Sequence, residues 1–162
     1  MQTRSTQILA LVAVVVAVAF GVAAAVILLS GSDTASRDDY QATVVNTRDR
    51  VDFAYARITK PTSTEDLIER IDDAGVVIGD TASDLDGAAV AEGFEDENEK
   101  LVRRLRAFSD VLLGTAAQFR DPTFAGTLPG ITTLSFPEWD AVNVVLADLN
   151  EQGIEVEPLE RH

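Results

Sequence analysis

The chain has 162 residues and a net charge of −14, from 27 acidic and 13 basic side chains. This charge excludes the electrostatic attraction on which nucleic-acid binding depends, and it disfavours anionic lipid headgroups. The absence of cysteine and the presence of one histidine, His162, exclude disulfides, thiolate nucleophiles and metal sites of sulfur or several imidazoles. We expect no cofactor, no metal site and no catalytic activity, with divalent cations only as non-specific counter-ions.

The first element is a run of 22 apolar residues at 8–29 that contains no charged side chain. A hydrocarbon core about 30 Å thick requires roughly 20 helical residues, so we predict a transmembrane helix over 8–30 that contacts the lipid bilayer through 8–29. Arg4 lies in the short tail 1–7 before it, which predicts a cytoplasmic N-terminus and an extracytoplasmic domain after the helix. The protein is then a single-pass protein of the cell membrane.

A cleaved signal peptide is the alternative for this segment. Ala23, Ala24 and Ala25 form a possible cleavage site of small residues. The apolar run continues to Leu29, which favours an uncleaved anchor, and a secreted helical protein remains the alternative.

Residues 31–36 form a polar linker, and Ser36 is placed to cap a helix that starts at Arg37. Apolar residues then recur in steps of three and four, which predicts a helix over 37–59 that ends before Pro61. Its predicted buried stripe comprises Tyr40, Val44, Thr47, Val51, Ala54 and Ile58.

A second helix is predicted after residues 61–66, where hydroxyl side chains precede acidic ones. Gly75, Gly79 and Gly87 each cost about 1 kcal/mol relative to alanine in a helix, and we interpret them as points of close helix contact, with a softened middle of the helix as the alternative. The predicted stripe is regular, at Leu67, Ile71, Ala74, Ile78, Thr81, Leu85 and Ala88.

A corner at residues 91–94, with Gly93 suited to a left-handed conformation, precedes a third helix over 95–120. On its exposed side, spacing of four residues allows Glu99 to pair with Arg103 and Arg106 with Asp110. The predicted stripe is Asn98, Leu101, Leu105, Phe108, Leu112, Thr115 and Phe119.

A long connection at residues 122–134 leads to a fourth helix, for which Ser135 and Glu138 predict a capping box. Gly153 ends this helix, and residues 154–162 are predicted to be an extended acidic tail outside the domain. Its predicted buried side is Trp139, Val142, Leu146 and Leu149.

These patterns predict an all-α protein: one N-terminal transmembrane helix followed by an extracytoplasmic antiparallel four-helix bundle over residues 37–153. No stretch alternates convincingly as a strand. Two features are candidates for partner contact. Phe53 lies off the apolar stripe of its helix, and an acidic patch surrounds the predicted corner, at Glu92, Glu95, Asp96, Glu97 and Glu99.

The whole chain resembles small single-pass, envelope-anchored helical proteins of high-GC Gram-positive (actinobacterial-type) bacteria. The resemblance rests on the anchor that follows Arg4, on KPTSTEDL at 60–67 and on FRDPTFAGTLPGITTLSFPEW at 119–139. Some proteins of that design are accessory subunits of membrane complexes, including respiratory ones. The resemblance implies a non-catalytic accessory or scaffold subunit whose partners are other membrane protein subunits. The alternative is a stand-alone extracytoplasmic module that binds a small ligand or a cationic partner.

Overall fold

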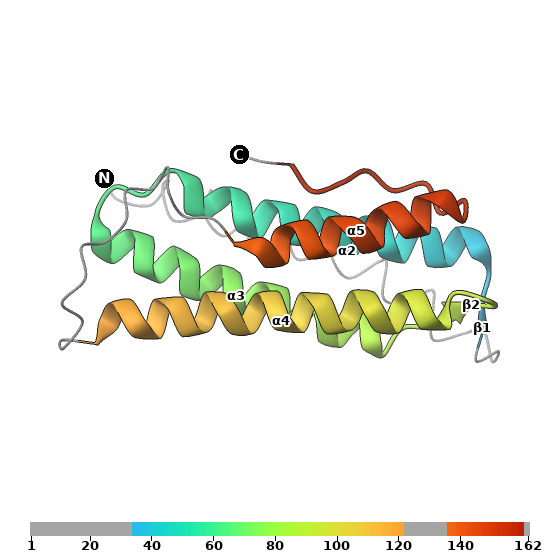
Figure 1. The fold of residues 1–162 in the computed structure, drawn as a ribbon, viewed down its shortest axis with the longest axis horizontal. Coiled ribbons are helices and arrows are strands. Elements are labelled where there is room, and N and C mark those ends of the chain that lie inside the picture. Colours follow the sequence, from blue (N-terminus) through green and yellow to red (C-terminus); the bar gives the residue numbers. More distant parts are fainter. Residues whose placement is uncertain (1–33, 122–135, 161–162) are drawn as a thin grey trace, which may run out of the picture. The chain divides into compact units, whose positions relative to one another are not determined.

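A computed structural model describes residues 34–121 and 136–160, and these form four long helices. The helices are α2 (Arg37–Ala56), α3 (Thr64–Asp86), α4 (Glu95–Arg120) and α5 (Pro137–Glu151), with a 3₁₀ turn η1 (Arg57–Thr59) after α2. Consecutive helices run in opposite directions (Figure 1). The prediction of an all-helical domain is confirmed.

The chain divides into two units, 1–33 and 34–162. The predicted tail 1–7 and transmembrane helix 8–30 lie outside the described residues. Among the helices of residues 34–121 and 136–160, none is both long and apolar enough to cross a membrane.

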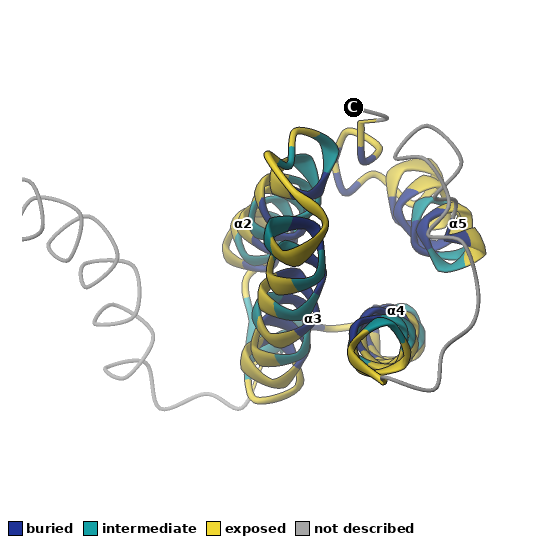
Figure 2. Ribbon diagram, turned by 90° about the vertical axis from the view of Figure 1, so that its left-hand side faces the viewer, coloured by how far each residue is buried: buried dark blue, intermediate teal, exposed yellow. Residues whose placement is uncertain are grey.

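The predicted apolar stripes form the core. Every stripe residue predicted for α2 and α5 is buried, as are the stripe of α3 as far as Leu85 and that of α4 as far as Leu112. The dark blue side of each helix faces the others in Figure 2. The spacing of apolar residues therefore identified the inward side of each helix correctly, because a helix buries one stripe against its neighbours.

Both predicted caps near the start of the domain are present. The Ser36 hydroxyl accepts a hydrogen bond from the Asp39 amide at 3.1 Å, and the Ser63 hydroxyl accepts one from the Asp66 amide at 3.1 Å. The capping box predicted for α5 is wrong in position, because Phe136 occupies the N-cap and offers no side-chain oxygen. Pro137 begins the helix, where its missing amide hydrogen costs nothing.

The linker predicted over 31–36 includes two residues, 34 and 35, that belong to a strand. Thr34–Ala35 forms a two-residue strand, β1, that pairs in parallel with β2 (Val90–Ala91). Two residues are too short for an alternating pattern, so nothing in the sequence indicated this pairing. The pairing places the beginning of the described unit beside the corner between α3 and α4.

Residues 154–160 are also part of the packed domain, although we predicted a tail beyond residue 153. Ile154, Val156 and Leu159 are buried, and the segment runs back along α5 and α2 (Figure 1). Burial of each of these three side chains contributes about 1.5–3 kcal/mol, and hydrogen bonds from α2 and α5 to the backbone of the segment also help to offset the cost of ordering it.

Helices α3 and α4 approach closely at two glycines. A Cβ atom on Gly75 would lie 2.8 Å from Leu113 Cγ, and one on Gly79 would lie 2.8 Å from Ser109 Oγ. The Ser109 hydroxyl donates a buried hydrogen bond of 2.7 Å to the Gly75 carbonyl. The interpretation as close contacts is confirmed for these two residues. It is wrong for Gly87, which ends α3 and would meet only ordinary contacts.

We predict that Gly75→Ala destabilises the domain by about 1–3 kcal/mol, because the new methyl group collides with the Leu113 side chain in a packed interface. Gly114→Ala is the matched control, since no atom lies within 4 Å of a Cβ at this position in α4. It should instead stabilise the domain by up to about 1 kcal/mol through helix propensity. Urea unfolding of both variants measures the difference, and equal effects would contradict the close approach.

Candidate functional site

The acidic patch predicted from the sequence lies around the start of α4, with Glu97 less exposed than the other four carboxylates. We call it the acidic corner. Gly93 adopts a left-handed conformation with φ of 87°, as predicted, and turns the chain from β2 into the helix. The Gly93 amide donates to a Glu95 carboxylate oxygen at 2.9 Å. Carboxylates in a first turn also oppose the positive end of the helix dipole, which explains why the charges are tolerated there. The residues of the acidic corner are Glu92, Glu95, Asp96, Glu97 and Glu99.

The carboxylates of this corner differ in whether they form hydrogen bonds or ion pairs with neighbouring side chains. Glu97 accepts from Lys100 at 3.3 Å, and a hydrogen bond from the Gln152 side chain is the main cause that lowers the pKa of Glu97. Glu99 pairs with Arg103 at 3.3 Å, as predicted from their spacing. Glu92 and Asp96 are exposed. A cationic partner would therefore meet charges that are held in place beside charges that are open to solvent.

Phe53 does not belong to the acidic corner. Its side chain is 69% exposed, which confirms that it lies off the buried stripe. It lies 16 residues after Arg37 in α2, roughly 24 Å along the helix at 1.5 Å per residue, whereas β1 and the acidic corner are at the end where α2 starts. The sequence suggested Phe53 and the acidic patch as two separate contact candidates, and they lie at different positions along the domain. A single exposed aromatic side chain is common on protein surfaces.

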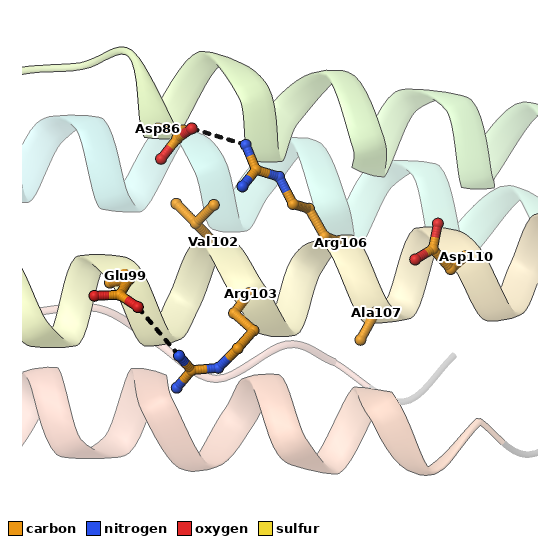
Figure 3. A pocket seen from close by; sticks show the side chains of 7 residues that line it. All are labelled: Asp86, Glu99, Val102, Arg103, Arg106, Ala107 and Asp110. Atoms are coloured by element: carbon orange, nitrogen blue, oxygen red, sulfur yellow. Dashed lines mark hydrogen bonds and ion pairs between the residues drawn. The ribbon is translucent and has the colours of Figure 1, made fainter.

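A hollow of about 440 Å³ lies against the outer side of α4 (Figure 3). Arg106 reaches Asp86 of α3 at 2.8 Å, not the predicted partner Asp110, because the neighbouring helix brings a carboxylate closer. The two arginines that line the hollow are each paired with a carboxylate, so the hollow offers no free cation for an anionic ligand. Its lining residues are Asp86, Glu99, Val102, Arg103, Arg106, Ala107 and Asp110.

Three further ion pairs join elements of the domain, whereas Arg48 with Asp49 and Arg70 with Asp66 each lie within one helix. Arg50 of α2 pairs with Asp84 of α3, Arg57 of η1 pairs with Asp73 of α3, and Arg120 of α4 pairs with Asp72 at 3.0 Å. Within residues 34–121 and 136–160, no three or more His, Cys, Asp or Glu side chains are grouped so that they could hold a metal ion.

Sequence reasoning missed a buried polar contact behind the acidic corner. The Tyr40 hydroxyl donates to Asn98 Oδ1 at 3.3 Å, and its ring packs 5.6 Å from that of Phe94. Burial, followed by the charges of Glu97 and Glu95, raises the pKa of Tyr40 above its ordinary value of 10.0. Both Tyr40 and Asn98 fall on predicted stripes, but the stripes alone did not indicate that they pair.

This pKa gives a pH dependence. Because the pKa of Tyr40 is raised in the folded state, its contribution to stability is complete below about pH 10 and decreases as the pH rises further. We predict that the free energy of unfolding of the native chain falls more steeply above pH 10 than that of Tyr40→Phe, which has no phenol to ionise.

At pH 7 the same variant should be less stable by about 1 kcal/mol, through the lost hydrogen bond to Asn98. Urea unfolding between pH 8 and pH 11.5 measures both effects. Parallel profiles for the two proteins would contradict a buried, hydrogen-bonded Tyr40.

Comparison with known proteins adds no functional assignment: no family model, no curated protein and no solved structure matches this chain.

Proposed function

We propose that this chain is a single-pass membrane protein whose helical domain lies outside the membrane and acts as a non-catalytic accessory or scaffold subunit of a larger membrane complex. The observation that carries the proposal is the uninterrupted apolar run at residues 8–29, with Arg4 before it and all acidic residues after it. Such a run has the length of a bilayer span, and its flanking charge favours a cytoplasmic N-terminus. The resemblance to envelope-anchored accessory proteins agrees with this reading.

The chemistry of the described surface supports a binding role. The arginines around the hollow on α4 pair with carboxylates of α3 and α4, and Arg50 of α2 pairs with Asp84 of α3. These ion pairs lie on the surface of the described domain, where charged side chains are available to a binding partner.

The acidic corner is the surface that we assign to the partner. It carries five carboxylates within eight residues, and the β1–β2 pair fixes the beginning of the described unit beside it. Opposite charges across an interface increase the association rate and the specificity of binding. The partner proposed here presents a basic face to this corner.

A charge-reversal experiment tests this assignment. The full chain is purified from membranes in a mild detergent, and co-purified proteins are identified and quantified by mass spectrometry. We predict recovery of one complex at fixed stoichiometry, and a loss of about tenfold or more with Glu92→Lys/Asp96→Lys, because like charges would then face each other. Glu69→Lys/Asp80→Lys makes the same charge change on an exposed part of α3 and should retain the complex.

Three outcomes would contradict the proposal. A mature chain that begins near Val26 and stays in the soluble fraction would indicate a cleaved signal peptide. Equal loss with both double variants would exclude the acidic corner as the contact. A chain that migrates alone and gains thermal stability from a small molecule would favour the stand-alone binding module.

A further inference from the structure

The side of the domain between α2 and α5 is closed by an extended segment instead of by direct helix packing. Contacts between these two helices are slight compared with those that join α2 to α3, α3 to α4 and α4 to α5. Residues 154–160 lie along this side, as the end-on view near the C-terminal label shows (Figure 2). Their buried side chains are Ile154, Val156 and Leu159, which are at most 5% exposed.

Side chains of α2 hold the backbone of this segment. Gln41 Oε1 accepts from the Glu155 amide at 3.0 Å, and the Arg48 guanidinium donates to the Pro158 carbonyl at 2.7 and 3.2 Å. Asp52 accepts from the Glu160 amide at 2.8 Å.

Side chains of α5 hold the backbone from the other side. Asn150 donates to the Val156 carbonyl at 2.9 Å. Asn143 accepts from the Leu159 amide at 2.7 Å and donates to the Leu159 carbonyl at 3.5 Å. The five polar side chains of the two helices thus contact main-chain atoms of the segment.

This pattern is the chemistry of peptide recognition. Main-chain hydrogen bonds provide affinity for an extended backbone, and pockets for alternate apolar side chains provide specificity. The contacts require an extended segment with the apolar spacing of residues 154, 156 and 159, but none of them requires that the segment be joined to the same copy of the chain.

We propose that the space between α2 and α5 is a peptide-binding groove that also accepts residues 154–160 of a second copy of this chain. The segment of the chain is the one sequence whose fit to the groove is established by its contacts. An exchange between copies preserves all of them, so its cost falls on the connection between α5 and the segment. That connection contains Gly153, whose φ of 88° lies in a region that glycine enters without strain.

Two complementary variants of the full chain test the exchange. The acceptor, Val156→Asp/Leu159→Asp, carries a segment that cannot fill the groove. The donor, Arg48→Glu/Asn150→Asp, carries an intact segment but places carboxylates against the carbonyls of Pro158 and Val156. We expect a 1:1 complex on mixing, measured by sedimentation in detergent, and no dimer of either variant alone. Circular dichroism confirms that each variant is folded.

The control is a donor that also carries Val156→Asp/Leu159→Asp. Complex formation by this chain would overturn the proposal, because the contact would then lie elsewhere. Donor and acceptor chains that are folded but do not associate at about 100 µM, a concentration at which even weak complexes form, would overturn it as well.

A cysteine experiment decides the question if either variant fails to fold. The native chain has no cysteine, so an introduced pair reports a single contact. Copies with Gln41→Cys are mixed with copies with Glu155→Cys and oxidised, and we expect cross-linked pairs of the two. Asp80→Cys replaces Gln41→Cys in the control, on an exposed part of α3. Cross-linking no greater than in this control would overturn the proposal.

Discussion

The core of this domain is completed by the packing of residues 154–160 into the side between α2 and α5. The other three sides are closed by direct contact of consecutive helices in antiparallel pairs, of which α2–α3 and α3–α4 are joined by short connections. On the fourth side, Ile154, Val156 and Leu159 supply the apolar surface that a helix face supplies elsewhere. The polar side chains of α2 and α5 satisfy the backbone groups that an isolated extended segment cannot pair with itself.

On the opposite side of the domain, α3 and α4 pack directly against each other. Because Gly75 and Gly79 have no side chains, α4 approaches α3 closely there, and the Ser109 hydroxyl donates a hydrogen bond to the Gly75 carbonyl. Ion pairs such as Arg106 with Asp86 lie along the exposed margin of the same contact. The domain therefore combines one tightly packed helix pair with one pair that is bridged by a separate segment, and these two sides should respond differently to substitution.

Much of this fold could be predicted from the sequence, because helix periodicity is a local property. The steps from Tyr40 to Ile58 and from Leu67 to Leu85 identified the buried sides, and Ser36 and Ser63 identified two helix starts. The β1–β2 pair and the packing of the last segment depend on residues that are far apart in the chain, so no local pattern contained them. The acidic corner was visible as a cluster in sequence, whereas the distance of Phe53 from it followed only from the direction of α2.

The end of the domain that carries the acidic corner also holds the connection to the last segment. The Gln152 side chain binds Glu97, and the Gln152 carbonyl accepts from Arg37, whose guanidinium lies 5.4 Å from the centre of the Phe94 ring. A cationic partner that takes the Glu97 carboxylate competes with Gln152 for it. Because Gln152 precedes the glycine at which the segment leaves α5, a partner bound at the corner would loosen the same connection that segment exchange must open. The two proposed contacts are therefore linked through one residue, and binding at the corner should favour exchange of the segment, not oppose it.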